Sequence, residues 1–278
     1  MGSLFFVLFA CSEYNYEAYP PKELEAPPIG DIEELETDFE IPAENSGLPE
    51  EGFDVPNIEF EGQAVEVMYV HSDDELYSLN ENGELTYIAD FIVEGTHSLD
   101  DQPKITDLAI DLDGHMFGVA GFDLYEINAS TGSMVLASTL DQYLNGLTFM
   151  ANGDLMGAGD GIFKIDPASG YTIPLVDDGY YNTSGDIVGH PNGLMYWTVR
   201  ENGGDGLVSI DAFGRTEYIG NIGVVNLYGL SYFDGNLYGF SSNGNIVTIN
   251  PDNAQALNNE LQDFSYWGAA ANPYRWSR

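Results

Sequence analysis

An all-β fold built from one repeated unit is the architecture that the sequence predicts. A phrase of about forty residues recurs along the chain, and its clearest copy, at 144–170, reads LNGLTFMANGDLMGAGDGIFKIDPASG. Each copy alternates short apolar segments with Asn-Gly or Asp-Gly pairs, which supply the positive φ that two-residue hairpins require. The 32 Gly, 18 Tyr and 15 Phe among 278 residues also fit a turn-rich β protein.

The repeats align on an apolar-x-x-apolar step that recurs about every 42 residues. The five steps are Leu76–Leu79, Leu124–Ile127, Ile162–Ile165, Leu207–Ile210 and Ile246–Ile249. A period of 40–50 residues is typical of a four-stranded β-propeller blade. Four steps are preceded by an expected inner strand, at Ile105–Ile110, Leu144–Met150, Gly185–Gly189 and Leu227–Tyr232. Each inner strand leads to a hairpin, at Asp113-Gly114, Asn152-Gly153, Asn192-Gly193 or Asp234-Gly235.

The first repeat lacks an inner strand of its own. It begins at Ala64–Ser72, which aligns with the second strands of the other repeats, whereas Tyr266–Pro273 repeats the inner-strand pattern with nothing after it. We therefore expect residues 62–278 to form a five-bladed propeller in which the C-terminal strand completes blade one. Such closure leaves no exposed edge strand between the two ends of the chain.

The repeats resemble those of the β-propeller superfamily of YVTN, NHL and YWTD type, especially lipoprotein propellers with the phrase L-Y-x-I-D-x-x-T-G. Residues 124–132 (LYEINASTG) and 162–170 (IFKIDPASG) carry that phrase best, and Tyr196-Trp197-Thr198 is similar to the YWTD motif. The resemblance covers residues 64–273. It implies a fold, and it implies no single activity, because propellers host many functions.

The amino terminus predicts an export signal. Residues 1–10 contain an apolar run that is shorter than the roughly 20 residues of a membrane span and fits the core of a signal peptide. Leu8-Phe9-Ala10-Cys11 resembles the lipobox of bacterial lipoproteins, which implies lipidation of Cys11; with Ser12 next, it implies delivery to the outer membrane or cell surface. The alternative is an ordinary signal peptide with an incidental cysteine. Cys11 is the only cysteine, so no intrachain disulfide can form.

Residues 11–61 differ sharply in composition from the rest. Between Ser12 and Glu61, acidic residues recur throughout, seven prolines interrupt the chain and Lys22 is the only basic residue. Repulsion between like charges and the scarcity of apolar surface predict a disordered tether that joins a lipid anchor to the folded part.

The charge of the chain limits its partners. With 46 acidic and 7 basic residues, the formal net charge is −39. Nucleic-acid binding depends on clustered Lys and Arg, so we exclude a nucleic-acid partner and expect contact with membranes only through the lipid. The same acidity favours a soluble monomer, and it is also compatible with binding of cations such as calcium.

The expected ligand-binding site lies where the inner strands begin, around the mouth of the central channel. Small residues there let the strands converge, while aromatic rings beside amides and carboxylates suit sugar rings or polar peptide ends. The candidate residues are Asp107, Asn145, Asp186, Tyr228 and Trp267 at the mouth, with Lys104, Tyr143, Tyr180, Tyr181, Arg200 and Tyr266 on the neighbouring loops.

Motifs that would indicate catalysis or a zinc site are absent from the sequence. The four histidines, His71, His97, His115 and His190, fall at different places in their repeats, and we interpret the Asp-Leu-Asp-Gly at 111–114 as a turn rather than a calcium loop. We therefore expect a non-catalytic module that binds an extracellular glycan, peptide or envelope protein without a cofactor. The alternatives are a metal-assisted hydrolase or lactonase, with Asp107, Asn145 and Asp186 holding calcium or magnesium, and a structural envelope scaffold.

Overall fold

The fold is taken from a computed structural model that describes residues 68–277 except 81, 97, 99–101 and 178. The expected signal peptide, Cys11, the acidic tether and residues 62–67 lie outside the described residues. Chain contacts separate Met1–Val55 from Pro56–Arg278, and everything reported below belongs to the second unit. Within the described residues, no helix has both the length and the apolar character needed to cross a membrane.

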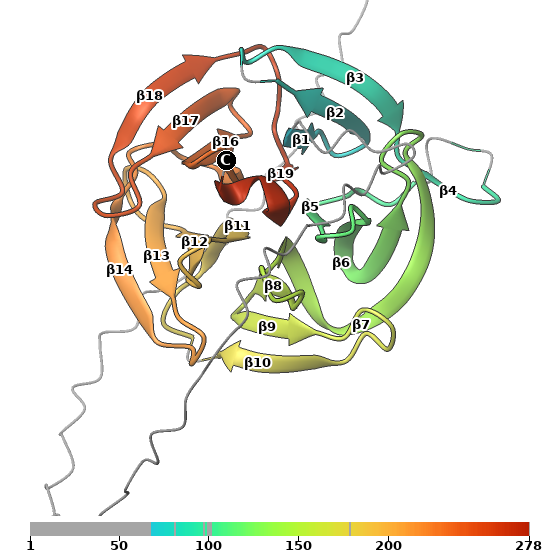
Figure 1. The fold of residues 1–278 in the computed structure, drawn as a ribbon, viewed down its shortest axis with the longest axis horizontal. Helices are drawn as coiled ribbons and strands as arrows, with labels where there is room; N and C mark the ends of the chain where they lie inside the picture. Colours follow the sequence, from blue (N-terminus) through green and yellow to red (C-terminus); the bar gives the residue numbers. More distant parts are fainter. Residues whose placement is uncertain (1–67, 81, 97, 99–101, 178, 278) are drawn as a thin grey trace, which may run out of the picture. The chain divides into compact units, whose positions relative to one another are not determined.

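The described chain is all-β, as the sequence predicted, and forms four largely antiparallel sheets around a common centre in a propeller-like arrangement (Figure 1). The first sheet contains β19 (Gly268–Ala270), β1 (Met68–His71), β2 (Glu75–Leu79) and β3 (Leu85–Asp90), in that order. The third contains β11 (Thr183–Gly189), β12 (Met195–Val199), β13 (Gly206–Ile210) and β14 (Thr216–Asn221). The fourth contains β15 (Leu227–Phe233), β16 (Asn236–Ser241), β17 (Asn245–Ile249) and β18 (Ala256–Leu261).

The second sheet is larger because two of its strands are long. It contains β5 (Asp107–Ile110), β6 (Met116–Ile127), β7 (Ser133–Phe149), β8 (Leu155–Gly159), β9 (Ile162–Ile165) and β10 (Thr172–Val176), with β4 (Ile92–Val93) beside β7. The start of β6 pairs with β5, whereas its end pairs with the start of β7. The end of β7 pairs instead with β8. Each long strand is therefore hydrogen-bonded to one strand over its first part and to a different strand over its last part. Gly121, with a φ of +67°, lies where β6 changes partner.

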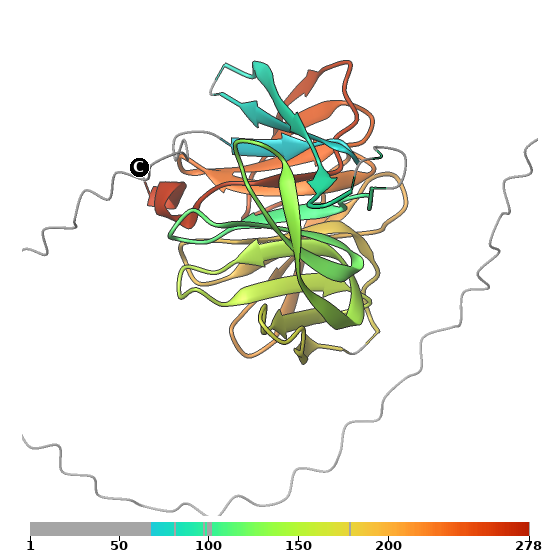
Figure 2. The same cartoon turned by 90° about the vertical axis from the view of Figure 1, so that its right-hand side faces the viewer.

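The C-terminal strand pairs with the first described strand, as the sequence predicted. In the antiparallel register, Tyr69 pairs with Ala270 and His71 pairs with Gly268. The short 3-10 helix η1 (Pro273–Ser277) follows β19 and lies on one face of the sheets (Figure 2). The two ends of the described chain are therefore joined by backbone hydrogen bonds within one sheet.

The turns after the inner strands follow the expected glycine chemistry but not all have the expected length. Gly114, Gly153, Gly193 and Gly235 all have φ between +79° and +86°. Only Asp234-Gly235 forms a two-residue hairpin, in which Asp234 also has positive φ and Phe233 pairs with Asn236.

The prediction of two-residue hairpins was wrong for the other three turns. At the β5–β6 turn, the backbone N–H of Asp111 donates to His115 O at 3.0 Å and that of Gly114 donates to Asp111 O at 3.1 Å. The same pair of bonds joins residues 150–154 and residues 190–194. Three-residue loops of this kind need positive φ only at their last residue, which explains why glycine alone adopts it.

Buried apolar side chains fill the spaces between neighbouring sheets. Between the third and fourth sheets, Val188 and Tyr196 pack with Leu230 and Val247. Each fully buried side chain of this size contributes about 1.5–3 kcal/mol to folding. The outermost strands, by contrast, are largely exposed, as the pattern of β18 shows. The core therefore lies between the sheets, and the inner strands are buried on both faces.

Candidate binding site at the mouth of the channel

Five strands meet at the centre through one residue each. The residues at this level are Asp107 on β5, Gly146 on β7, Asp186 on β11, Gly229 on β15 and Gly268 on β19. A β-carbon added to Gly146 would lie 3.0 Å from the Cα of Asp186, and one added to Gly268 would lie 2.9 Å from the Cα of Asp107. The expectation that small residues allow these strands to converge is confirmed.

Asp107 and Asp186 connect neighbouring inner strands. The Oδ2 atom of Asp107 accepts a hydrogen bond of 2.6 Å from the backbone N–H of Leu147 on β7. Asp186 accepts corresponding bonds from the backbone N–H of Leu230 on β15 and from its own neighbour Ile187. The inner strands are sheet edges, so these N–H groups have no strand beside them, and the carboxylates satisfy them.

The carboxyl groups of Asp107 and Asp186 are both fully buried. Burial raises the pKa of Asp107 well above its ordinary value, and the charge of the nearby Asp186 raises it further. Burial also raises the pKa of Asp186 to about 7, although hydrogen bonds from Asp107 and from backbone N–H groups oppose the rise. Both carboxyl groups therefore hold a proton more readily than a free aspartic acid does, because burial disfavours their charged forms.

His71 belongs to the same buried group, although the sequence did not single it out. Its Nδ1 donates to Ser72 O at 2.5 Å, and burial lowers the pKa of the imidazole to about 4, so the ring is neutral. Its Nε2 and the Oδ1 of Asp107 are both buried without a hydrogen-bond partner among the described residues. A β-carbon on Gly268 would overlap both atoms, so the two acceptors flank the same point of the backbone.

The residues that precede this level form the mouth. Asn145, Tyr228 and Trp267 are each half-buried, and Thr106 lies beside them in the same strand position. The Oδ1 atom of Asn145 is buried and has no partner in the described part of the chain. The mouth therefore combines two large aromatic rings with one unsatisfied amide oxygen.

The other candidate residues lie farther out. Lys104 is exposed and forms ion pairs with Asp73 at 2.9 Å and Asp74 at 3.2 Å. Arg200 is exposed at the end of β12. Tyr266 is fully buried, packs against Phe240, and donates its hydroxyl hydrogen to Gln262 Oε1.

Two aromatic pairs lie before the inner strands, one within the long strands β6 and β7 and one on the loop that enters β11. Tyr143 is 57% exposed and lies edge-to-face with Phe122, with ring centroids 5.5 Å apart. Tyr180 and Tyr181 form a second edge-to-face pair at 4.7 Å, and Tyr181 also contacts Trp197. The sequence predicted Tyr143, Tyr180 and Tyr181 as site residues. It did not predict Phe122, which follows Gly121 within the long strand β6.

The other end of the channel is closed. A cavity of about 10 Å³, room for roughly one water molecule, is lined by residues of β5, β7, β11, β15 and β19 together with Trp276 of η1. Trp276 is buried and contacts Tyr232 edge-on. Trp276 therefore covers this end of the inner strands.

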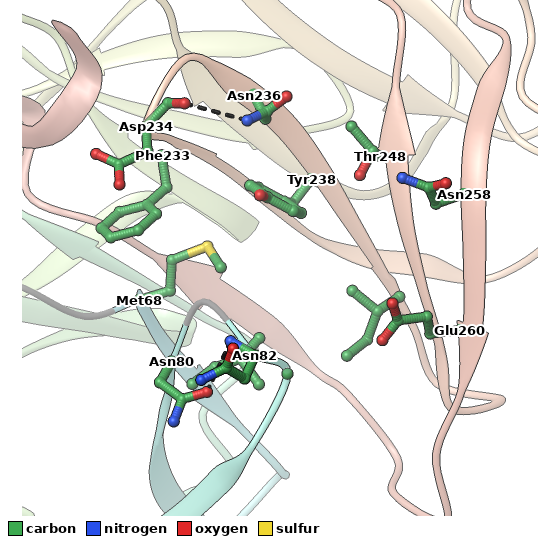
Figure 3. A pocket seen from close by; sticks show the side chains of 13 residues that line it. Met68, Asn80, Asn82, Phe233, Asp234, Asn236, Tyr238, Thr248, Asn258 and Glu260 are labelled. Carbon is green, nitrogen blue, oxygen red and sulfur yellow. Dashed lines mark hydrogen bonds between the residues drawn. The ribbon is translucent and has the colours of Figure 1, made fainter. Parts of the chain in front are cut away.

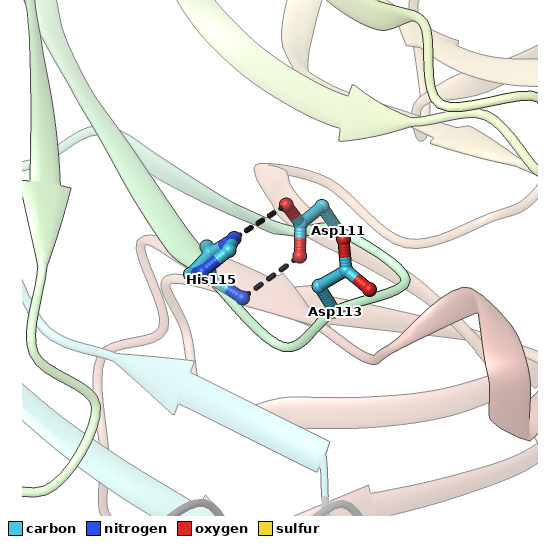
Figure 4. A group of neighbouring side chains, drawn as sticks. All are labelled: Asp111, Asp113 and His115. Atoms are coloured by element: carbon cyan, nitrogen blue, oxygen red, sulfur yellow. Dashed lines mark hydrogen bonds and ion pairs between the residues drawn. The ribbon is translucent and has the colours of Figure 1, made fainter. Parts of the chain in front are cut away.

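Acidic groups with metal-ligand spacing occur elsewhere. Among the described His, Cys, Asp and Glu residues, one group of three has ligand atoms within 4.8 Å of one another, namely Asp111, Asp113 and His115 (Figure 4). Asp111 already accepts the backbone N–H of His115 at 2.8 Å and lies 2.9 Å from its Nδ1. Asp211 and Arg215 repeat this pairing in another turn, as expected for turn chemistry.

No family model and no curated protein matches the chain. Solved structures with a similar backbone include hydrazine synthase from Kuenenia stuttgartiensis, with 14% identity and a TM-score of 0.42 over 62% of this chain and 53% of that chain. A protein of unknown function from Bacteroides caccae has 10% identity and a TM-score of 0.43 over 70% and 73%. U3-55K has 9% identity and a TM-score of 0.44 over 70% and 61%. The chain thus spans about half the length of the hydrazine synthase chain.

Proposed function

We propose that the described sheets form a five-bladed β-propeller. The second sheet supplies two blades, because β6 and β7 each pair with one neighbour over their first part and another over their last. Contacts at the centre run in a closed circuit from β5 to β7, β11, β15, β19 and back to β5. Five apolar clusters separate the blades in the described chain, one for each neighbouring pair.

The function that the geometry supports best is non-catalytic binding of a polar ligand, a glycan or a peptide end, at the mouth of the channel. The observation that carries this proposal is the buried Oδ1 of Asn145, an acceptor without a donor, at the same level of the inner strands as the half-buried rings of Tyr228 and Trp267. A buried acceptor without a partner costs free energy that a ligand donor would recover. The aromatic rings offer apolar faces to the same ligand.

The proposed setting is the bacterial cell envelope. The lipobox at 8–11 and the acidic tether support a chain anchored by lipid on Cys11, with the propeller held away from the membrane. A binding module in such a position would meet extracellular glycans, peptides or envelope proteins.

The experiment is a screen of the full chain against glycans and cell-wall fragments, with and without calcium, followed by titration of any hit. We expect Trp267→Ala combined with Tyr228→Ala to abolish binding of the hit while the melting temperature stays close to that of the wild type. Phe213→Ala, at an exposed ring on the β13–β14 turn, is the matched control. Unchanged affinity in the double variant would contradict the proposal.

A metal-assisted hydrolase or lactonase is the second candidate, and one observation favours it. The oxygens Asp107 Oδ1 and Asn145 Oδ1 are both buried acceptors without donors, and hard oxygen ligands suit calcium or magnesium. Elemental analysis and melting with and without a chelator decide between the candidates. Stoichiometric metal whose removal lowers the melting temperature, with the effect lost in Asp107→Asn, would favour the enzyme.

A further inference from the structure

A second concave site lies away from the channel mouth, between the first and fourth sheets. Its volume is about 530 Å³, within the range of small-molecule binding sites in proteins. Buried apolar side chains form its floor, namely Met68, Leu79, Phe233 and Ile246. Polar side chains form its walls, and Figure 3 shows them facing one another across the opening.

Three adjacent strands of the fourth sheet supply one wall. Tyr238 on β16 pairs directly with Thr248 on β17, which pairs with Asn258 on β18. Residues that pair across strands point to the same side of a sheet, so the three side chains form one transverse row. In the described part of the chain, the side chains of Thr248 and Asn258 make no hydrogen bond with protein, and their donors and acceptors are open to a ligand.

The opposite wall is also rich in amides. Asn82 lies at the β2–β3 turn, where its backbone N–H binds Asn80 Oδ1 at 2.9 Å and its own side chain lines the pocket. On the wall of the fourth sheet, Asn236 of β16 lies at the rim, where one N–H of its amide donates to Asp234 O at 3.1 Å. Amides both donate and accept, so this set can bind hydroxyl groups, which do the same.

An equivalent groove elsewhere in the molecule shows that the architecture does not require these polar side chains. The groove between the second and third sheets has a volume of about 410 Å³. Its matching row is Met156, Lys164 and Ile173, which pair across β8, β9 and β10 as Tyr238, Thr248 and Asn258 do across β16, β17 and β18. The groove between the first and fourth sheets therefore has a row of tyrosine, threonine and asparagine. The corresponding row in the other groove is methionine, lysine and isoleucine.

Charge narrows the class of ligand. The lining contains no Lys or Arg, and its two carboxylates are Asp234 and Glu260. Asp234 is paired with Arg275 at 3.5 Å, which leaves Glu260 as an exposed acceptor on the rim. An anionic ligand would meet an acidic wall without a compensating cation, so phosphates, sulfates and uronates are disfavoured.

We propose that this pocket binds a neutral saccharide, with one sugar ring against Tyr238 and its hydroxyl groups hydrogen-bonded to Thr248, Asn258 and Asn82. The apolar face of a pyranose matches an aromatic ring, and its vicinal hydroxyls match side-chain amides. The site is distinct from the channel mouth and does not depend on the ligand proposed there.

The test uses the full chain and soluble neutral oligosaccharides of glucose, galactose, mannose and N-acetylglucosamine, titrated calorimetrically, with a polyuronate as the charged comparison. Asn258→Ala and Thr248→Val remove single hydrogen-bonding groups at the pocket, and we expect each to weaken binding about tenfold. Asn259→Ala is the matched control, because Asn259 is the next residue of β18, pairs with Val247 and points to the other side.

Saturable binding of a neutral oligosaccharide that weakens in Asn258→Ala and Thr248→Val but not in Asn259→Ala supports the pocket. The same binding should survive in the double variant at Trp267 and Tyr228, which separates this inference from the proposal for the channel mouth. Absence of binding by every neutral probe at millimolar concentration, equal affinity in the Asn258 and Asn259 variants, or preference for the polyuronate overturns the inference.

Discussion

At the scale of single residues, the centre of the molecule depends on how Asp107 and Asp186 are placed. Alignment of the chain's own repeats predicted Asp107 and Asp186 at the channel mouth, because each falls at the start of an expected inner strand. It could not predict that each would be completely buried and bound to a backbone N–H of the next inner strand. That outcome depends on the closeness of the strands, which arises from glycines at Gly146, Gly229 and Gly268.

The raised pKa values of the two buried carboxyl groups make the stability of the fold depend on pH. Because folding raises the pKa values of Asp107 and Asp186, the folded state binds more protons than the unfolded state between about pH 4 and pH 7. Stability from this source is present below about pH 4 and is lost as pH rises toward 7, by up to about 1.4 kcal/mol per pH unit for each proton. Asp107→Asn keeps the hydrogen bonds but removes one titrating group.

We therefore expect the stability of Asp107→Asn relative to the wild type to increase from pH 4 to pH 7. Urea unfolding at a series of pH values measures this difference directly, and the many surface carboxylates cancel because both proteins contain them. A difference that is independent of pH would contradict the raised pKa of Asp107.

Gly268 is the second residue-scale test. A methyl group there would overlap His71 Nε2 and Asp107 Oδ1 and lie 2.9 Å from the Cα of Asp107. We expect Gly268→Ala to lower the free energy of unfolding by about 1–3 kcal/mol or more, as overpacking of a core does. Gly220→Ala, where the nearest atom would lie 3.1 Å away, should cost less in the same denaturant experiment. Equal effects would show that the centre is less tightly packed than described.

His71 shows what more careful reading of the sequence could have predicted. The segment that contains it aligns with the other second strands, which places His71 in register with Val119, Ala158, Thr198 and Phe240. These positions are buried, and the same alignment would have placed the histidine at that buried level, which the sequence analysis did not predict. The pairing of Nδ1 with the neighbouring carbonyl could not be predicted, because it depends on the local turn.

At the scale of elements, the least predictable part was the closing helix η1. Residues 273–277 carry no helical periodicity, and nothing in the repeat pattern predicts that they cover the channel. The structure places Trp276 there, 4% exposed, against Gly189 and Tyr232. A β-carbon on Gly189 would lie 2.7 Å from the indole ring, so glycine makes room for it.

Trp276→Ala should destabilise the fold by about 3–5 kcal/mol, the usual cost of removing a buried tryptophan. Thermal or urea unfolding measures the loss. Tyr274→Ala is a control in the same helix, because Tyr274 is 48% exposed, and it should change stability far less. Similar stabilities for the two variants would contradict the role of Trp276 as a core residue.

The long strands β6 and β7 show why the repeats could be predicted from the sequence but the boundaries of the sheets could not. The periodic apolar steps predicted separate units, and the pairing within each unit follows them. The chain nevertheless continues as strand from one expected strand to the next, and a single hydrogen-bonded sheet results. Sequence periodicity reports which residues repeat, whereas sheet continuity depends on whether the connecting backbone stays extended.

At the scale of the whole molecule, pairing of β19 with β1 closes the circuit of inner strands. This long-range contact was predictable, because the first repeat lacks the strand that the C-terminal segment supplies. Removing residues 266–278 leaves β1 and β5 without their inner neighbour and exposes the cluster of Met68, Val70 and Phe240. We expect the truncated chain to lose cooperative unfolding and to bind a hydrophobic dye.

The outcome that contradicts ring closure is a truncated chain that melts as cooperatively, and at the same temperature, as the full protein. Circular dichroism recorded during heating distinguishes the two outcomes, because a cooperative transition depends on continuous packing around the ring.

We propose that this propeller-like protein binds ligands without catalysis, at the channel mouth and in the pocket between the first and fourth sheets. The most direct measurement is calorimetric titration of the ligand found by screening, and of a neutral oligosaccharide, against three full-length proteins: the wild type, Trp267→Ala/Tyr228→Ala and Asn258→Ala. We expect the screened ligand to lose affinity only for Trp267→Ala/Tyr228→Ala and the oligosaccharide to lose affinity only for Asn258→Ala. Affinities that are the same in all three proteins would contradict it.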